Sequence, residues 1–319
     1  MGGAWGKDLG RKLRLCFVSR YFTPMMGSGS PRVEDLSGIL AGMGQEIHVV
    51  TVVPPRGFPK TDEKADYSDK NRKVYRVRVP EGVPSIIYAL LSTLELFLET
   101  LKVTLRNSVD LVWATVPNED SGLAGWLAAR ITGRPLVVDV RDDWEIALID
   151  DTYGFERLLA KTIYYAFNIL YASADAVVCT SETLRRRISA RRGSTEGLFK
   201  ITNGARLGLV RPLTESERRS VRRRYGAQGE LVVFTGTLSS HQAPWNLVDA
   251  ASELRSRGVK ASVVVAGGGP LLEELRMRSA KLSEPVRFVG LLSRDEVTKL
   301  IVASDIGVIT LRDSVACRS

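Results

Sequence analysis

Asp139, Arg141, Asp142, Asp143 and Trp144 lie within six consecutive residues and bring three carboxylates, a guanidinium and an indole together. Carboxylates and guanidinium groups can hydrogen-bond to sugar hydroxyls, and an indole can stack on the apolar face of a sugar ring. The run follows a predicted strand at 135–140, and open α/β sheets bind ligands at the carboxyl ends of their strands. We therefore predict a ligand site here. The alternative is an internal network of arginine and aspartate that fixes the loop.

Two glycine-rich turns occur where a predicted strand passes into a helix: Gly27-Ser28-Gly29-Ser30 and Gly267-Gly268-Gly269-Pro270. Such turns allow exposed backbone N–H groups and the positive end of a helix to approach a phosphate. The dinucleotide fingerprint needs another glycine three residues later, and Arg32 and Leu272 stand there instead. A nicotinamide or flavin dehydrogenase is therefore disfavoured. Each turn could also be only a tight connection.

Metal-ligating patterns are weak throughout the sequence. No Asp-x-Asp pair, which commonly holds a divalent ion against a nucleotide diphosphate, occurs in the chain. Cys16, Cys179 and Cys317 are far apart, and only two histidines accompany them. We therefore predict metal-free chemistry with no cofactor, in which helix N-termini and cationic or hydrogen-bonding side chains would stabilise a leaving diphosphate.

Short β-branched runs alternate with longer helical patterns, which is typical of parallel-sheet α/β domains. After a polar leader at 1–12, we predict a Rossmann-like domain over 13–205, an Arg- and Glu-rich connector over 206–229 and a second, smaller Rossmann-like domain over 230–319. The predicted strands are 13–19, 46–53, 74–79, 110–115, 135–140, 176–180, 231–235, 261–266, 286–289 and 306–310. A second sheet that ends on a strand has one poorly covered face. We expect either a partner there or a chain that is the front part of a longer protein.

Length and composition fit this organisation. A chain of 319 residues with 44% hydrophobic and 25% charged residues is expected to fold into two soluble domains. The net charge of +9 favours anionic partners without choosing among them. No signal peptide is recognisable at the start, so we expect a cytoplasmic protein.

A series of segments then follows a recognisable order: LRLCFVSRYFTPMMGSGSPRVEDLSGILAGMGQEIHVVT, DLVWATVPNEDSGLAGWLAARITGRPLVVDVRDDW, ADAVVCTSETLRRRI, FKITNGA, ELVVFTGTLSSHQAPWNLVDAASEL, VVVAGGGPLLEEL, VRFVGLLSRDEV and ASDIGVITLRDS. This order resembles the retaining glycosyltransferases of family 4, in the branch with Arg-Asp-x-Trp. Their GT-B architecture has two Rossmann-like domains. The resemblance implies a nucleotide-sugar donor bound mainly by the second domain, and a glycan or lipid-linked acceptor bound mainly by the first.

The resemblance also implies roles for individual residues. Asp142 and Arg141 would contact the acceptor or the sugar beside Asp143, with Trp144 as a platform, and His241 would be a weaker candidate for a diphosphate or sugar contact. The remaining donor contacts would come from two glycine-containing loops and one strand end: Gly27, Ser28, Gly29, Gly236, Thr237, Gln242, Phe288, Val289 and Gly290.

Two departures from the family pattern affect the expected activity. Many members have Arg and Lys after the strand that matches 231–235, whereas Thr237 takes the Arg place here and no lysine follows. Members also carry a Glu-x7-Glu motif after the segment ITLRDS, where only 315–319 remain in this sequence. We therefore expect a C-terminally truncated transferase with little or no activity. The alternative is a non-catalytic remnant, or a binding subunit completed by another chain.

Helix 84–106 has an apolar stripe of leucine and isoleucine with charges on its other face. We expect the stripe to pack on the sheet; the alternative is an interfacial helix that places the protein on the inner face of the cell membrane.

Dense arginines at 185–192 and 218–224 lack interleaved aromatic residues. They therefore predict solvated helix faces rather than a nucleic-acid site.

Overall fold

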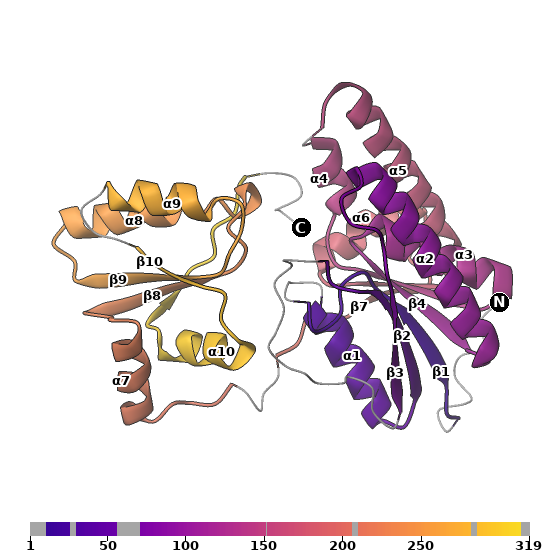
Figure 1. The fold of residues 1–319 in the computed structure, drawn as a ribbon, viewed down its shortest axis with the longest axis horizontal. Helices are drawn as coiled ribbons and strands as arrows, with labels where there is room; N and C mark the ends of the chain where they lie inside the picture. Colours follow the sequence, from indigo (N-terminus) through magenta and orange to yellow (C-terminus); the bar gives the residue numbers. More distant parts are fainter. Residues whose placement is uncertain are drawn as a thin grey trace. The chain divides into compact units, whose positions relative to one another are not determined.

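The computed structural model describes residues 11–25, 30–55, 71–150, 152–205, 210–281 and 286–313. The chain divides into two compact units, one up to Asn203 and the other from Gly204. Each unit contains one parallel sheet with helices on its faces (Figure 1). The predicted class, two parallel-sheet α/β domains, is confirmed.

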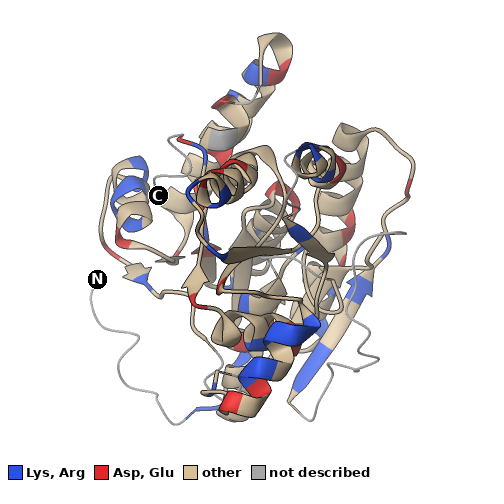
Figure 2. Cartoon of the chain, turned by 90° about the vertical axis from the view of Figure 1, so that its left-hand side faces the viewer, with Lys and Arg blue, Asp and Glu red and all other residues tan. Residues whose placement is uncertain are grey.

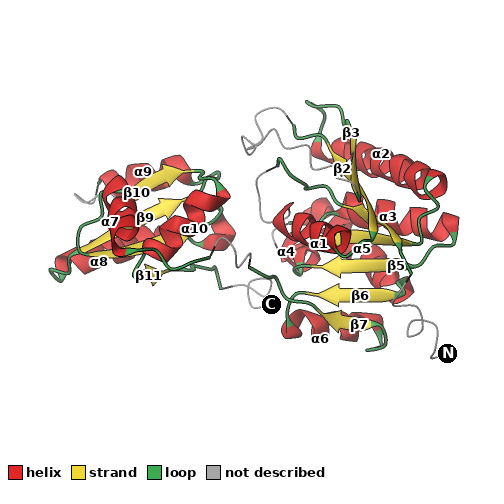
Figure 3. Cartoon of the chain, turned by 90° about the horizontal axis from the view of Figure 1, so that it is seen from below, coloured by secondary structure: helices red, strands yellow, loops and turns green. Residues whose placement is uncertain are grey.

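The first unit has a seven-stranded parallel sheet in the order β3-β2-β1-β4-β5-β6-β7. Figure 3 shows β5, β6 and β7 side by side in this sheet. The strands are β1 (Arg14–Val18), β2 (Glu46–Val52), β3 (Arg72–Val77), β4 (Leu111–Val116), β5 (Leu136–Val140), β6 (Ala176–Cys179) and β7 (Leu198–Lys200). The order reverses between β1 and β4, so the chain leaves these neighbouring strands in opposite directions across the sheet. The carboxyl ends of β1 and β4 therefore form the switch point of the sheet.

Helices cover the two faces of this sheet unequally. α1 (Ser30–Gly42) packs on one face, where Val33 and Ala41 join the side chains of Phe17 and Val49 in a core cluster. The other face carries a larger cluster that includes buried residues from four helices. These are α2 (Ser85–Arg106), α3 (Glu119–Thr132), α5 (Gly154–Ser173) and α6 (Glu182–Arg192).

The second unit has a four-stranded parallel sheet in the order β10-β9-β8-β11 between two helical layers. α8 and α9 lie on one face and α7 and α10 on the other (Figure 1). The strands are β8 (Glu230–Thr235), β9 (Ala261–Ala266), β10 (Arg287–Gly290) and β11 (Ile306–Gly307); the helices are α7 (Glu215–Arg224), α8 (Trp245–Ser256), α9 (Leu272–Ala280) and α10 (Arg294–Ala303). Here the switch point lies between β8 and β11.

Two helices and a strand of the described residues were not anticipated from the sequence. α4 (Trp144–Asp150) and β7 are short, and α7 falls within the segment predicted as a connector. α7 begins with a capping box at Thr214 and Glu217, which is a strong helix start signal that the charge-rich composition obscured.

The arginines of α7 bind the rest of the second unit. Arg218 and Arg222 both form ion pairs with Asp305, and Arg224 pairs with Glu296 of α10. Acidic and basic residues occur together on the helices (Figure 2). A purely solvated basic face is therefore the wrong description of these three arginines, because they attach α7 to its own unit.

α2 is oriented opposite to our expectation. Its buried residues are Ser92, Leu96, Thr100, Val103 and Thr104, most of them polar. Most of the apolar stripe faces outward, with six of its residues between 45% and 67% exposed: Ile86, Ile87, Leu90, Leu94, Leu98 and Leu105. The other three, Leu91, Phe97 and Leu101, are half-buried, and Phe97 packs against the main core cluster. The prediction that this stripe packs on the sheet is wrong for these six residues. The physical reason is that small polar residues allow α2 to lie close against α3, the helix with which it makes its most extensive contacts.

Two leucines of α2 test this orientation because they differ only in the side of the helix they occupy. Leu96→Ala is expected to lower the free energy of unfolding by about 2–5 kcal/mol, since it removes a fully buried side chain and leaves a cavity. Leu94→Ala removes an exposed side chain and is expected to change it by no more than about 0.5 kcal/mol. Urea denaturation followed by circular dichroism measures both. Equal losses in the two variants would contradict the outward stripe.

Candidate functional site

The end of β5 is fixed by a buried ion pair. Asp139 is fully buried and binds Arg32 of α1, with Nη2 of Arg32 2.9 Å from Oδ1 of Asp139. Arg32 also donates to the carbonyl oxygen of Ile201 at 3.0 Å and to Oδ1 of Asn203 at 3.1 Å. Asp139 is therefore not available to a ligand. It joins β5 to α1 and to the segment that follows β7.

Two further carboxylates of this region are buried against α6. Asp143 accepts a hydrogen bond from Nη1 of Arg187 at 2.5 Å. Glu145 accepts from the hydroxyl of Tyr171 at 2.6 Å and from Nη2 of Arg191 at 3.2 Å. These contacts hold the start of α4 against α5 and α6. The alternative interpretation of the run, an internal network that fixes the loop, is thus correct for Asp139 and Asp143.

The indole of Trp144 packs edge-on against Phe167, with ring centroids 5.3 Å apart. The ring lies against the main core cluster of the unit and is half-buried. This placement gives Trp144 a packing function and does not support its predicted role as a sugar platform.

Asp142 is the exposed carboxylate of the run. Desolvation of the carboxylate by the protein around it raises the pKa of Asp142 to about 6; Arg141 opposes the shift, and the nearby carboxylates of Glu145 and Asp143 add to it. Arg141 is half-buried, and desolvation lowers its pKa although Asp142 and Asp139 favour its charged form. The backbone carbonyl of Arg141 accepts a hydrogen bond from the hydroxyl of Thr180 at 2.8 Å. Asp142 and Arg141 thus stand together at the carboxyl end of β5.

In the second unit, the loop after β8 packs on the triple-glycine turn after β9. The backbone N–H of Gly236 donates to Ala266 and that of Leu238 donates to Gly268. A Cβ atom on Gly267 would lie 1.9 Å from the carbonyl oxygen of Gly236, so only glycine allows this approach. Gly269 meets Leu238 in the same way, at 2.5 Å. The interpretation of 267–269 as a tight connection accounts for both glycines.

The other residues predicted for the donor lie along the same edge. Gly236 and Thr237 are exposed directly after β8, and His241 and Gln242 follow in a 3-10 turn at Ser240–Gln242. The backbone carbonyls of His241 and Gln242 accept hydrogen bonds from Arg312 N and Thr310 Oγ1, at 2.9 and 2.5 Å, which attaches the turn to the segment after β11.

Phe288, Val289 and Gly290 form the end of β10, and the carbonyl oxygen of Gly290 accepts from Gly267 N at 2.8 Å. The structure therefore brings the predicted residues of the second unit to one edge of its sheet. Gly27, Ser28 and Gly29 lie outside the described residues. Within the described ranges, no group of three or more His, Cys, Asp or Glu side chains is arranged to hold a metal ion.

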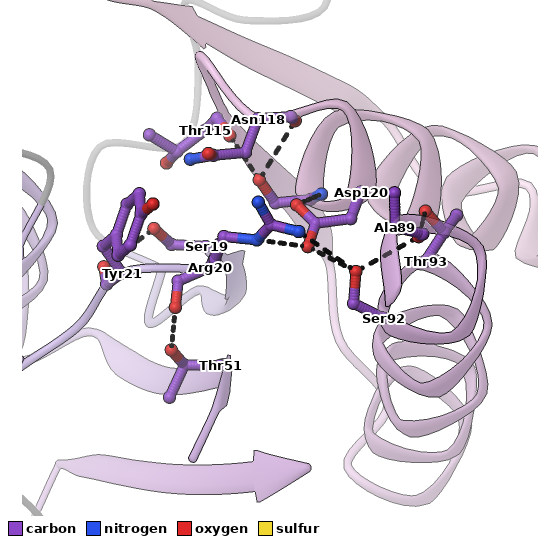
Figure 4. Close-up of polar contacts among 11 residues, drawn as sticks. Ser19, Arg20, Tyr21, Thr51, Ala89, Ser92, Thr93, Thr115, Asn118 and Asp120 are labelled. Carbon is purple, nitrogen blue, oxygen red and sulfur yellow. Dashed lines mark hydrogen bonds and ion pairs between the residues drawn. The ribbon is translucent and has the colours of Figure 1, made fainter. Parts of the chain in front are cut away.

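Sequence reasoning missed a polar cluster at the switch point of the first sheet. Arg20 follows β1, Asp120 follows β4, and the two form an ion pair with Nε 2.7 Å from Oδ2 (Figure 4). Ser92 of α2 donates to the same oxygen of Asp120 at 2.7 Å. The position of each residue after a predicted strand was a signal, but the strand order that makes the two strands neighbours is not readable from the sequence.

Asp142→Asn is expected to stabilise the folded protein near neutral pH. The pKa of Asp142 is about 6 in the folded state and 3.8 ordinarily, so folding disfavours the ionised form. This penalty is absent below about pH 4, grows as pH rises and is complete above about pH 6. Because the side chain is exposed, solvent screening limits the expected gain to about 1 kcal/mol at about pH 7.5. Urea unfolding of the parent and the variant at about pH 4 and at about pH 7.5 measures the difference in their free energies of unfolding.

Glu95→Gln is the control, since it neutralises an exposed carboxylate on α2. It is expected to change the free energy of unfolding at about pH 7.5 by no more than about 0.5 kcal/mol, as is usual for an exposed position. An Asp142→Asn variant that is no more stable than the parent at the higher pH, or equally stabilised at both, would contradict the raised pKa.

Comparisons with known proteins cover both units. The family model described as "Glycosyl transferase 4-like domain" matches residues 27–204, and "Glycosyl transferases group 1" matches residues 229–317. Mannosylfructose-phosphate synthase of Agrobacterium fabrum is 22% identical over 274 residues, which cover 79% of this chain and 60% of that protein. A GDP-mannose-dependent alpha-(1-6)-phosphatidylinositol dimannoside mannosyltransferase of Mycobacterium tuberculosis is 31% identical over 139 residues, 43% of this chain and 35% of that protein.

Solved structures agree on the fold. Anabaena HepE in complex with UDP and glucose superposes with a TM-score of 0.65 at 18% identity, over 94% of this chain and 74% of that chain. WaaG, a glycosyltransferase involved in lipopolysaccharide biosynthesis, gives 0.66 at 13% identity, over 93% and 75%. The first family model alone spans more than half of the sequence. The chain therefore belongs to glycosyltransferase family 4, with the GT-B fold class.

Proposed function

We propose that this protein is a retaining, metal-independent glycosyltransferase that moves a hexose-type sugar from a nucleotide-sugar donor to a glycan or lipid-linked acceptor. The observation that carries the proposal is that two glycosyltransferase family models match in succession, one on each structural unit. The relatives support a donor of this kind: HepE was crystallised with UDP-glucose, and the mycobacterial enzyme is named as GDP-mannose-dependent.

Asp142 is our candidate for the group that contacts the acceptor. It is exposed at the carboxyl end of β5, where open α/β sheets bind ligands. A carboxylate with a pKa near 6 is suited to accept a proton from a hydroxyl near neutral pH. Arg141 beside it would support the developing negative charge.

The donor would bind at the edge formed by the ends of β8, β9 and β10. Exposed Gly236 and Thr237 lie there, with His241 and Gln242 in the adjacent turn. Backbone N–H groups and the hydroxyl of Thr237 could then hold the diphosphate without a metal ion. The absence of an Asp-x-Asp pair from the sequence supports this assignment.

We also propose peripheral contact with a membrane on its cytosolic side. The outward stripe of α2 presents a continuous set of leucine and isoleucine side chains. An amphipathic helix of this kind can insert its apolar face at the boundary between lipid headgroups and acyl chains. None of the helices in the described residues is long and apolar enough to cross a membrane. Contact with lipid would bring the first unit to a lipid-linked acceptor.

Binding of a donor is tested by thermal denaturation with UDP-, GDP- and ADP-hexoses in the presence of EDTA. A ligand at about 100 times its dissociation constant stabilises the native state by about 2.7 kcal/mol, so at least one donor is expected to raise Tm by several degrees. Thr237→Glu should abolish the shift because its carboxylate repels the diphosphate. Ser220→Glu adds the same charge on α7 and should retain it.

A donor-dependent shift that disappears in EDTA would contradict metal independence. No shift with any donor would favour the competing function, a non-catalytic remnant or a binding subunit. Where a donor binds, the anomeric configuration of the transferred sugar, measured by NMR on the product, decides between retention and inversion.

Membrane contact is tested by sedimentation with vesicles of phosphatidylcholine and phosphatidylglycerol. The parent protein is expected to pellet with the vesicles, and Leu90→Gln/Leu94→Gln is expected to remain mostly in the supernatant. Met277→Gln/Val259→Gln removes two exposed apolar side chains from the second unit and should pellet like the parent. Equal sedimentation of both variants, or none by the parent, would rule out lipid contact through α2.

A further inference from the structure

The carboxyl ends of β1 and β4 mark the place where ligands bind in sheets of this topology. Arg20 is the second residue after β1, and Asp120 lies in the first turn of α3 after β4. Neither the sequence motifs nor the family models assign a function to these residues. The cluster also includes Ser92 and the ring of Tyr88, both from α2.

The guanidinium of Arg20 is held firmly on one side. Its Nε atom lies 2.7 Å from Oδ2 of Asp120, and its Nη2 atom lies 3.3 Å from Oγ of Ser92 (Figure 4). Asp120 is fully buried and also accepts from the backbone N–H of Ser121 at 2.7 Å. The carbon atom of the guanidinium is 5.4 Å from the centre of the Tyr88 ring. These contacts fix the direction in which the guanidinium points.

The other side of the guanidinium has N–H groups that make no hydrogen bond within the described residues. An arginine carries five N–H donors. Within the described part of the chain, Arg20 donates only from Nε and Nη2, and Nη1 makes no hydrogen bond. The side chain is 17% exposed. Arg20 therefore presents fixed, unused donors at the switch point.

The local charge indicates which ligand these donors suit. Burial opposes the charged form of Arg20, but the carboxylates of Asp120 and Glu119 raise its pKa overall. One guanidinium is thus set against two carboxylates, so a phosphate would meet no excess of positive charge. The oxygen of an uncharged hydroxyl needs only a hydrogen-bond donor, and the remaining N–H groups of Arg20 supply it.

We propose that Arg20, positioned by Asp120 and Ser92, binds a hydroxyl oxygen of an uncharged sugar or polyol, and so recognises the acceptor. This inference rests on the proposed function, because it takes the first unit to be the acceptor side. The part of the acceptor that binds at the switch point is then a neutral hydroxyl-bearing group rather than a phosphate or carboxylate.

The test uses saturation-transfer difference NMR on the full chain with glucose, mannose, galactose, myo-inositol and inorganic phosphate as probes. At least one polyol is expected to receive saturation. Adding inorganic phosphate is not expected to displace it. Arg20→Gln/Asp120→Asn removes both charges together, so no buried charge is left unpaired. It is expected to weaken polyol binding about tenfold, and Arg20→Lys should recover part of that loss.

The matched control is Arg14→Gln/Asp110→Asn. Arg14 and Asp110 form an ion pair 3.2 Å apart at the opposite, amino ends of the same two strands. This variant should bind the polyol as the parent does. The proposal is overturned if no polyol receives saturation, if phosphate displaces the polyol, or if both double variants lose binding equally.

The proposal and the proposed function can fail separately. Donor binding is read from Tm shifts through Thr237, whereas polyol binding is read through Arg20 without any donor. A rise in Tm with a donor, but no polyol binding, would contradict only the proposal that Arg20 binds a hydroxyl at the switch point. Polyol binding through Arg20 with no response to any donor would contradict the transferase and the acceptor role of Arg20, but not the binding of a hydroxyl by Arg20.

Discussion

Buried carboxylates paired with arginines are the constraint on which the first unit depends. Asp139 binds Arg32 of α1, Asp143 binds Arg187, and Glu145 binds Arg191, the last two from α6. A buried carboxylate without its partner costs several kcal/mol, so the loop after β5 can take this shape only when α1 and α6 are docked. Arg191 lies over the rings of Tyr164 and Tyr171, which secures it further. The exposed position of Asp142 is a consequence: its neighbours are turned inward by their partners.

The two units build the carboxyl-end edges of their sheets by different means. In the first, side-chain ion pairs fix the loops, and the cluster of Arg20, Asp120 and Ser92 repeats this pattern at the switch point. In the second, backbone packs on backbone, and Gly267 and Gly269 are required because any Cβ would collide with the neighbouring loop. Oriented backbone groups suit a diphosphate, whereas mixed donors and acceptors suit sugar hydroxyls. This difference in construction is what we expect if, as proposed, the second unit binds the donor and the first binds the acceptor.

The sequence was sufficient for the alternation of strands and helices, because buried parallel strands read as short β-branched runs whatever surrounds them. It also placed the segment 139–144 at the carboxyl end of a strand, as the structure does. It could not tell Asp142 from Asp139 and Asp143, since that distinction depends on which arginines of distant helices reach each carboxylate. Arg20 and Asp120 were missed for the same reason: 100 residues separate them, and only the strand order brings them together. Short elements such as α4 and β7 carry too few residues to show a periodicity.

α2 shows why an amphipathic pattern alone does not reveal which side is inside. Hydropathy predicts the leucine side as the buried one, yet α2 packs through Ser92, Thr100 and Thr104. Thr and Ser pack well where helices approach closely, and α3 presents a surface rich in small residues, including Ala124 and Ala128. Six large aliphatic side chains on the outside contribute little to folding in water. This outward face is the reason for the proposed contact with lipid, because its aliphatic character matches lipid better than the mixed polar rim of a protein interface.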